Sequence, residues 1–475
     1  MKDIIRKSDI TVNLIIYTVL SIACILIMIP SFGNGFFSDD YSWLLKAKEN
    51  TVKNFGTIFF EPAPYEYFRP VPVIVFSVMW NFFEGGFIYY RILTLALHIL
   101  TTIFIYHLLL STGFGRKVSA LSALVFAVMA CHSESLYSVY SINELLSALF
   151  VFSGLYVFLS GIKFRGVISA ILFLLAVLSR ESAFCFIPLI LLFNIKSKKL
   201  RLFNALFISL FVTGLYTALR LISFMNYSEI YAGGNSGILQ LNPLIIVYKL
   251  FHFIINMLIP VKSIFYIIGF EFYETLRNII IEPGQNILLF AVLVIALGGI
   301  IVMIIFLLFK VSRKIFLFPL LVAACGILVY LPFEGTAERF LYLPSAGIAL
   351  LIGLFCIELV KRKFKPAYFI IIFILFIYSF SVYQRAAVWK ETSVRTESAV
   401  LKIHSIIGGD SSVKNVLMQD VPTIINGVFF FNQYNFNQIW KYHFPDEKII
   451  FWFYKKPENI NTDRTLKFSD FATYP

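Results

Sequence analysis

Residues 11–31, TVNLIIYTVLSIACILIMIPS, contain no charged side chain and decide the fold class. One bilayer crossing takes about 20 mostly apolar residues in a helix, so this stretch predicts a membrane-spanning helix. It lacks the small-residue pattern at which a signal peptide is cleaved, and we therefore expect the segment to be retained.

The rest of the chain has the same character. Of its 475 residues, 59% are hydrophobic and 14% are charged, and the mean hydropathy is +0.82. Soluble domains carry roughly a quarter charged residues, so these values exclude a soluble enzyme and a disordered chain. They predict an all-α polytopic membrane domain.

Further apolar runs supply the other expected spans. They cover residues 87–110, 118–137, 143–160, 201–224, 286–309, 315–332, 344–360 and 366–384. Another run, 166–195, is interrupted by Arg180-Glu181, and a single helix would bury both charges at mid-depth. We therefore expect two short helices that meet at the outer surface, which gives about eleven spans in all. The segment 244–262 is expected to be interfacial or re-entrant and to end at Pro260.

The net charge of +13 is organised as short basic clusters between apolar runs. These clusters are Lys2/Arg6/Lys7, Arg116/Lys117, Lys163/Arg165, Lys196/Lys198/Lys199/Arg201, Lys310/Arg313/Lys314 and Lys361/Arg362/Lys363/Lys365. Basic residues in short loops mark the cytoplasmic side of a membrane protein. The pattern predicts an integral membrane protein with a cytoplasmic N-terminus and an outer C-terminal region, and it argues against a nucleic-acid partner.

Two hydrophilic regions are expected outside the membrane. They are the loop 32–86 after the first span and the tail 385–475, which divide the chain into a transmembrane domain, 1–384, and a C-terminal extracytoplasmic domain. In the tail, residues 414–420 and 448–456 are typical of strands, and Asn426-Gly427 is typical of a turn. We expect this tail to form a small α/β domain.

The strongest candidate for chemistry is Phe36-Phe37-Ser38-Asp39-Asp40-Tyr41, just beyond the first span. Adjacent carboxylates between aromatic residues are costly to ionise, so one of them can act as a general base, or the pair can hold a divalent cation such as Mg or Mn. The alternative is a solvated loop in which Asp40 caps a helix over 41–48.

Other ionisable residues gather at the predicted outer ends of the spans. They are His132 and Glu134, Glu144, Arg180 and Glu181, and Glu338 and Arg339, with Tyr342 following. Such residues either serve function or form ion pairs between helices. His98 lies in mid-span on the same helical face as Arg91 and fits a packing role or a cavity. Arg220 could bind a phosphate or extend to the interface.

Several chemistries have no sequence support. The five cysteines (Cys24, Cys131, Cys185, Cys325 and Cys356) lie in or beside apolar runs without a CxxC pair, so neither a disulfide framework nor a thiolate metal site is expected. The sequence has no HxxxH pattern, P-loop or dinucleotide fingerprint, which argues against an ATP-driven pump.

The ordered motifs resemble the GT-C membrane glycosyltransferases, above all the transmembrane O-mannosyltransferases that carry TPR repeats and bacterial relatives of the protein O-mannosyltransferase and aminoarabinose-transferase type. The matching stretches are Phe37–Tyr41, Phe68-Arg69-Pro70-Val71, Tyr90–Leu93 with His98, Phe126-Ala127 with His132–Ser135, Leu178–Ala183 with Pro188, and Glu338–Gly347. They extend over roughly residues 30–350.

The sequence departs from that branch at several positions. Met129-Ala130 stands where a His-Pro is usual, Ile142 stands where an arginine is common, and Glu144 replaces an aspartate. The TPR repeats are missing and a different tail takes their place. The acceptor of the TPR-bearing members therefore cannot be transferred to this chain.

The resemblance implies transfer of a sugar from a polyprenyl-phosphate-linked donor to an acceptor hydroxyl on the outer face, with a GT-C fold. It assigns Asp39 as the base, with Asp40 beside it as an orienting partner or metal ligand. It assigns the donor phosphate to cationic residues: Arg339 and Arg180 first, then Arg69, Arg91 and Arg220. The expected cavity residues are His132, Glu134, Glu144, Glu181, Glu338, Tyr342 and His98.

The implied partners are the lipid-linked donor, membrane lipid, and an acceptor protein or envelope glycan or lipid. A polytopic lipid or glycan transporter or flippase is the main alternative, although such proteins usually show inverted repeats and charges at mid-membrane. A third possibility is a non-catalytic assembly factor whose tail binds other envelope proteins.

Overall fold

The membrane helices define the architecture of the computed structural model. It describes residues 2–192, 199–227, 242–267, 298–299, 302, 313–332, 336–408, 412–422, 424–425, 428–453 and 462–471. Within these ranges, five helical segments are long and apolar enough to cross a membrane: Ile10–Gly33, Phe87–Ser111, Ile142–Leu159, Leu202–Asn226 and Ala367–Ile407. A sixth is obtained if the pair Arg116–Val128 and Ala130–Tyr137, bent by 50°, counts as one span. The chain is an integral membrane protein, and the predicted number of eleven spans is not confirmed.

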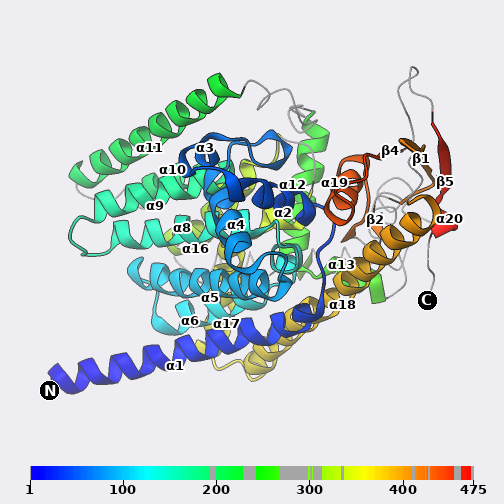
Figure 1. Cartoon of the computed structure of the whole chain (residues 1–475). Helices are drawn as coiled ribbons and strands as arrows, with labels where there is room; N and C mark the ends of the chain where they lie inside the picture. Colours follow the sequence, from blue (N-terminus) through cyan, green and yellow to red (C-terminus); the bar gives the residue numbers. More distant parts are fainter. Residues whose placement is uncertain are drawn as a thin grey trace.

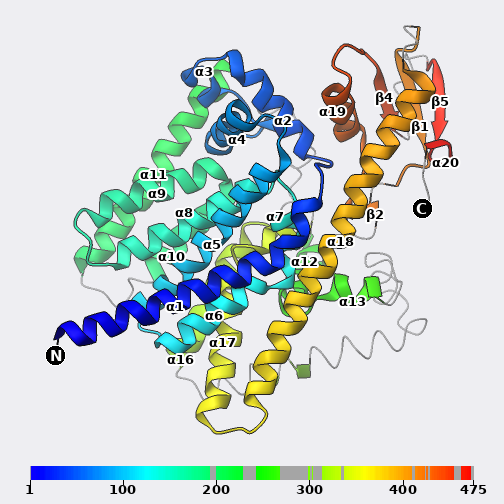
Figure 2. The same ribbon diagram turned by 60° about the horizontal axis from the view of Figure 1, so that its bottom comes forward.

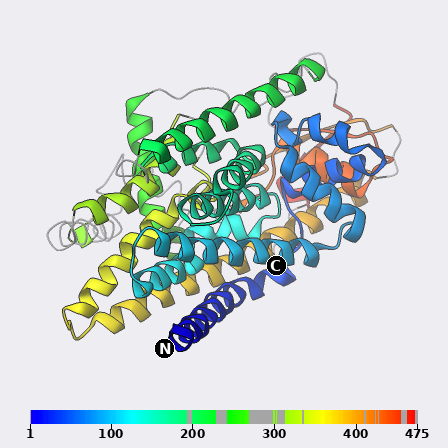
Figure 3. The ribbon, with the colours of Figure 1, turned by 90° about the vertical axis from the view of Figure 1, so that its left-hand side faces the viewer.

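The helical part is a bundle (Figure 1). Its longer helices are α1 (Lys2–Met28), α5 (Phe87–Ser111), α6 (Arg116–Val128), α8 (Ile142–Leu159), α9 (Arg165–Ser179), α11 (Lys199–Asn226), α12 (Pro243–Leu258), α16 (Arg313–Leu328), α17 (Ser345–Lys361) and α18 (Ala367–Ile407). α8 packs between α5 and α9, and α17 packs between α6 and α16. α11 lies on the opposite side of the bundle from α1 (Figure 3).

The outer surface of the bundle is apolar where lipid would cover it. On α11, Leu210 is 73% exposed, and on α18 Phe369 is 69% exposed. Exposed side chains of this size would be a liability in water. Their positions therefore agree with helices that face a bilayer.

Two further predicted segments can be compared with the described helices, and a third cannot. The run 166–195 is broken at the expected place, because α9 ends at Ser179 and is followed by the 3₁₀ helix η5 (Glu181–Cys185) and by α10 (Phe186–Leu192). α12 ends in front of Pro260, and α13 (Val261–Ile267) follows it. The predicted span 286–309 lies outside the described residues except at 298–299 and 302.

The loop after the first span, 32–86, which is predicted to be the first outer loop, folds into short helices. They are η1 (Ile29–Gly33), α2 (Asp40–Glu49), η2 (Asn50–Val52), α3 (Phe55–Phe60), η3 (Pro64–Glu66) and α4 (Pro70–Phe83). α2 packs on α4, which begins with Pro70 at its first helical position, where a missing N–H costs nothing. This loop therefore presents its residues on packed helices, not on a solvated coil.

The C-terminal region carries a small sheet beside the bundle (Figure 2). Its elements are β1 (Asn415–Gln419), β2 (Ile424–Ile425), β3 (Val428–Phe429), α19 (Gln433–His443), β4 (Ile450–Phe453), β5 (Arg464–Lys467) and α20 (Phe468–Phe471). The strand order is β4-β1-β5 with parallel pairing, and Asn415 lies opposite Ile450 in the register. The small sheet predicted from the sequence is confirmed. The predicted turn at 426–427 lies outside the described residues, between β2 and β3.

Helix α18 connects the two parts without a break. It runs from Ala367 to Ile407, so the predicted domain boundary at 384/385 falls inside it. Aromatic side chains of α19 pack on the sheet, with the Phe436 and Phe451 ring centroids 4.7 Å apart. The division into two domains stays a proposal.

A close helix contact gives a test of this packing. A Cβ added at Gly347 of α17 would lie 2.3 Å from the carbonyl oxygen of Pro319 in α16. We expect Gly347→Ala to force the helices apart and to destabilise the protein by about 1–3 kcal/mol. The measurement is the thermal unfolding midpoint in detergent, followed by tryptophan fluorescence.

Gly214 of α11 is the matched control, because a Cβ there meets no described atom within 4 Å. Gly214→Ala should leave the midpoint unchanged or raise it slightly, since alanine favours helix. Equal midpoints for Gly347→Ala and the wild type would contradict the packing of α16 on α17.

Candidate functional site

Aromatic side chains hold the segment that carries the paired aspartates. Phe37 is buried, and its ring centroid lies 4.7 Å from that of Trp389 in α18. Phe36 packs edge-on against Phe87 of α5 at 5.0 Å. These contacts fix the chain at Ser38, whose φ of 46° is in the left-handed region and costs a non-glycine residue roughly 1–2 kcal/mol. A strained conformation of this kind is often found at functional sites.

Asp39 stands at the N-cap of α2 but does not act as a cap. Within the described chain, its carboxylate makes no bond to the N–H groups of that helix. Instead its Oδ1 accepts a hydrogen bond from the hydroxyl of Tyr65 in η3, a residue whose φ is 61°. The residue as a whole is intermediate between buried and exposed, and its carboxylate is held in place by the fold.

The electrostatic setting of Asp39 suits proton transfer. Burial raises the pKa of its carboxyl above the ordinary value, and the charge of Arg339 and the hydrogen bond from Tyr65 oppose that rise. The neighbouring charge of Glu134 raises the pKa further. A carboxylate with a raised pKa is a better base than one at the surface.

Asp40 has a different role from its neighbour. It is fully buried, and its Oδ1 accepts the backbone N–H of Tyr140 at 2.8 Å while its Oδ2 accepts that of Phe37 at 3.4 Å. It therefore connects the first outer loop to the segment before α8. Burial raises the pKa of Asp40 to about 7, although the charge of Arg91 lowers it.

The paired aspartates do not fit a metal ion. Asp40 uses its two oxygens on backbone N–H groups, and Oδ1 of Asp39 is used on Tyr65. The two carboxylates thus have separate partners and do not share one ligand position. No group of three or more His, Cys, Asp or Glu side chains in the described part of the chain could hold a metal ion. We derive no step through one.

Arg339 joins this region to the other end of the transmembrane domain. It lies in η9 (Glu338–Leu341), and its guanidinium pairs with Glu134 of α7 (Ser133–Tyr137). The same guanidinium donates to the hydroxyl of Tyr140 at 2.5 Å, and the backbone N–H of Tyr140 is the group that holds Asp40. Residues about 200 positions apart in the sequence thereby meet, and the charge of Arg339 also acts on Asp39.

Arg180 and Arg339 both lie against the ring of Phe340. The guanidinium carbon of Arg180 is 5.2 Å from the ring centroid of Phe340, and that of Arg339 is also 5.2 Å from it. Arg180 forms an ion pair with Glu144 of α8. Glu181, its neighbour in the sequence, instead accepts from Arg69 at 2.9 Å. Arg180 and Glu181 are neighbours in the sequence, but they pair with residues of different segments and not with each other.

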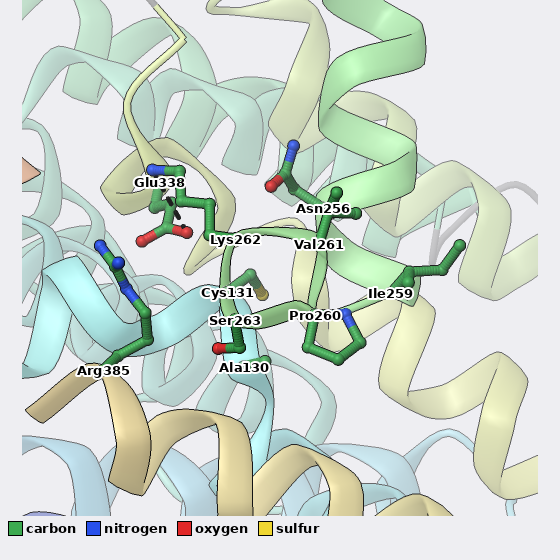
Figure 4. A pocket seen from close by; sticks show the side chains of 10 residues that line it. All are labelled: Ala130, Cys131, Asn256, Ile259, Pro260, Val261, Lys262, Ser263, Glu338 and Arg385. Carbon is green, nitrogen blue, oxygen red and sulfur yellow. Dashed lines mark ion pairs between the residues drawn. The ribbon is translucent and has the colours of Figure 1, made fainter. Parts of the chain in front are cut away.

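A small pocket lies next to Glu338 (Figure 4). Glu338 accepts from Ser133 Oγ at 2.6 Å and pairs with Lys262 at 3.3 Å. Arg385 of α18 and Asn256 of α12 also line the pocket. The sequence analysis missed Lys262 and Arg385, and no local motif distinguishes them from other basic residues near apolar runs. Tyr65 and Tyr140 were not predicted either, because no local motif distinguishes them from the other tyrosines.

Four predicted site residues are fully buried in the bundle. Arg91 donates to the backbone carbonyls of Leu136 and Tyr137, so its guanidinium is used inside the bundle and does not fit a phosphate site. His98, His132 and Tyr342 form a packed cluster: the hydroxyl of Tyr342 is 2.8 Å from His98 Nδ1, and His132 Nε2 is 2.8 Å from Ser345 Oγ. All four side chains are buried and have partners inside the bundle.

Arg220 lies in α11, on a different side of the site. Its guanidinium is 3.5 Å from the hydroxyl of Tyr216, whose ring packs on Phe68 at 6.0 Å. Phe68 precedes Arg69 in the sequence, so α11 covers the outer loop near that arginine. Arg220 is therefore linked through Tyr216 to Phe68, the residue before Arg69.

The fold has known counterparts. A scan against protein-family models finds no match, and a search of curated protein sequences finds none. ArnT from Cupriavidus metallidurans is similar in structure: the apo form has a TM-score of 0.53 at 9% identity, covering 91% of this chain and 88% of ArnT. ArnT bound to undecaprenyl phosphate has a TM-score of 0.51 at 11% identity, covering 91% of this chain and 89% of ArnT.

AglB, an oligosaccharyltransferase from Archaeoglobus fulgidus in complex with an inhibitory peptide and a dolichol-phosphate, has a TM-score of 0.46 at 14% identity. The comparison covers 85% of this chain and 62% of AglB, so the chain spans less than two thirds of that protein. The nearly full-length match to ArnT shows that this chain and ArnT share a fold. The resemblance inferred from the sequence motifs is confirmed at the level of the fold.

The buried carboxyl of Asp40 gives a pH prediction. Its pKa is raised in the folded state, so its contribution to stability is present below about pH 4 and is lost as the pH rises through about 7. Asparagine cannot ionise and lacks this loss. We therefore follow the difference between two thermal unfolding midpoints, that of the wild type minus that of Asp40→Asn. This difference should decrease as the pH is raised from about 4 to about 7 and stay constant at higher pH.

Glu61 provides the opposite sign as a control. It pairs with Lys46 at 2.6 Å and Lys53 at 2.7 Å, and these partners lower its pKa. The unfolding midpoint of the wild type minus that of Glu61→Gln should grow as the pH rises through the acidic range. A difference for Asp40→Asn that also grows with pH would contradict the assignment of a raised pKa to Asp40.

Proposed function

We propose that this protein transfers a sugar from a polyprenyl-phosphate-linked donor to an acceptor hydroxyl on the outer face of a bacterial inner membrane. One observation carries the proposal: Asp39 is a carboxylate held by a hydrogen bond from Tyr65 and acted on by the charge of Arg339, in a chain with the ArnT fold. The N-terminus would then be cytoplasmic and the C-terminal domain extracytoplasmic. Membrane lipid surrounds the bundle, and the acceptor is a protein or an envelope glycan or lipid.

In this mechanism Asp39 is the general base. Its carboxylate takes the proton of the acceptor hydroxyl as the hydroxyl oxygen attacks the anomeric carbon. The bond from that carbon to the phosphate oxygen breaks, and the phosphate leaves with the electron pair. A single displacement of this kind inverts the configuration at the anomeric carbon.

The leaving phosphate needs fixed positive charge. Arg339 is the first candidate because its positive charge acts on the Asp39 carboxyl and lowers its pKa, and Arg180 shares the Phe340 ring with it. Donors fixed before the reaction stabilise developing charge without reorganisation. Lys262 and Arg385, which line the neighbouring pocket, would extend this positive region along the donor phosphate.

The glutamates hold these cations in place. Glu134 pairs with Arg339, Glu144 with Arg180, and Glu181 with Arg69. In this scheme the carboxylates orient guanidinium groups that would otherwise adopt several conformations. Their role is positioning, and Asp39 alone among the described carboxylates is assigned to proton transfer.

Replacement of Asp39 tests the base. Asp39→Asn keeps the size of the side chain but removes its ability to take a proton, so we expect at least a hundredfold loss of turnover. The assay follows release of undecaprenyl phosphate from a panel of undecaprenyl-phosphate-linked hexoses and aminoarabinose in membranes that contain the protein. Asp446→Asn, at an exposed position in the C-terminal region, is the matched control and should leave turnover unchanged.

Normal turnover by Asp39→Asn at normal expression would remove Asp39 from its role. Movement of labelled lipid across liposomes by the wild type, without any release of undecaprenyl phosphate, would favour a flippase over a transferase.

Arg339 has a separate test. Arg339→Lys keeps the positive charge but cannot bond to Glu134 and Tyr140 with one planar group. We expect kcat/KM to fall about tenfold to a hundredfold in the same assay, the effect of losing one fixed donor at a developing charge. Arg362→Lys, on an exposed arginine that pairs with Glu358 at the end of α17, is the control. An unchanged kcat/KM for Arg339→Lys would exclude Arg339 from the phosphate site.

A further inference from the structure

Asn435 of α19 is a fully buried polar residue whose side chain faces the first outer loop. Its Nδ2 donates to Ser38 Oγ at 2.8 Å, and its Oδ1 lies 2.6 Å from the hydroxyl of Tyr65. Both partners adjoin Asp39, Ser38 in the sequence and Tyr65 through its hydrogen bond. A residue almost 400 positions away is therefore part of the surroundings of the proposed base.

The rest of α19 is docked on the same loop. The ring centroid of Tyr434 lies 4.6 Å from that of Tyr65, and that of Tyr442 lies 5.1 Å from that of Tyr41 in α2. At its exposed edge Lys441 pairs with Glu49 at 3.1 Å. These contacts hold Asn435 at a fixed place, so its hydrogen bonds are part of a packed interface.

The chain of polar groups can serve both protonation states of Asp39. A phenol has one proton, so when Tyr65 donates to the ionised carboxylate its oxygen is free to accept from the Asn435 amide N–H. The amide oxygen then accepts from Ser38. When Asp39 is protonated the direction reverses: Tyr65 donates to the amide oxygen, and the amide nitrogen donates to Ser38. A half turn of the amide separates the two arrangements.

We infer that Asn435 is a positioning residue for Asp39, acting through the hydroxyl of Tyr65, and that the C-terminal domain thereby completes the site. The inference rests on the proposed function of Asp39. The acceptor hydroxyl would approach Asp39 next to α19. The tail is then required for the reaction itself and is more than a cover over the membrane domain.

A purely structural role for Asn435 makes a different prediction. Asn437 on the same helix shows that role: its side chain bonds to the backbone of Gln433 and Phe451 within the C-terminal domain. Loss of such contacts loosens the domain and lowers activity equally at every pH. Loss of a hydrogen bond that favours the ionised form of Asp39 instead moves its titration.

The experiment compares Asn435→Ala, Tyr65→Phe, the double variant and Asn437→Ala in the full-length protein. The first readout is the pH at which a hydrophobic carbodiimide half-maximally labels Asp39, determined by mass spectrometry, with fragmentation to separate Asp39 from Asp40. The second readout is the acidic limb of kcat/KM for the undecaprenyl-phosphate-linked sugars. The charged groups that face Asp39 in the described structure, Arg339, Glu134 and Asp40, are the same in all variants.

The hydrogen bond from Tyr65 to the ionised carboxylate is charge-assisted and therefore stronger than the bond that Tyr65 makes with the neutral acid, and Asn435 supports it by donating to the Tyr65 oxygen. Tyr65→Phe and Asn435→Ala should therefore each move both readouts to higher pH by about one unit. Asn435→Ala should add little in the Tyr65→Phe background, since the two residues act in series. Asn437→Ala should move neither readout. Unmoved midpoints for Asn435→Ala, or full additivity with Tyr65→Phe, would overturn the inference.

The two proposals fail in different ways. If Asp39→Asn abolishes transfer but Asn435→Ala leaves the labelling midpoint unchanged, only the role of Asn435 is wrong. If Asn435→Ala moves the labelling midpoint while Asp39→Asn retains transfer, Asn435 positions the carboxyl but Asp39 is not the base.

Discussion

The hydrogen bond from Tyr65 to Asp39 is the interaction on which the site depends, because it holds a carboxylate whose burial makes ionisation costly. Everything around it restrains one of the two partners. Aromatic packing of Phe37 on Trp389 fixes the chain before Asp39, and the backbone N–H groups that bind Asp40 fix the chain after it. One aspartate of the pair is therefore structural, and the other is the proposed base.

The second constraint is that buried charges must be paired. Each glutamate at the predicted outer ends of the helices has a cationic partner from a distant segment: Glu134 with Arg339, Glu144 with Arg180, Glu181 with Arg69 and Glu338 with Lys262. An unpaired charge in such surroundings would cost several kcal/mol. The pairs join segments that are far apart in the sequence.

The sequence predicts the parts of this structure that depend on local composition. Apolar runs mark α1, α5, α8, α11 and α18, and the strand pattern marks β1 and β4. The partners of each charge depend on long-range packing, which no local pattern encodes. For this reason Arg91 and His98 seemed candidates for the site although both are buried in the bundle, and Tyr65 and Asn435 carried no signal at all. Arg180 and Glu181 illustrate the same limit, because neighbours in the sequence pair in different directions.

The most direct test of the central claim, that Asp39 and the cations near Arg339 act on one lipid-linked substrate, is a cryo-EM structure of the protein with undecaprenyl phosphate bound. We expect the phosphate to contact Arg339, or Lys262 and Arg385 in the adjoining pocket, with an opening that leads from the phosphate to the Asp39 carboxylate. A phosphate bound at the opposite end of the bundle, separated from Asp39 by packed helices, would contradict the claim.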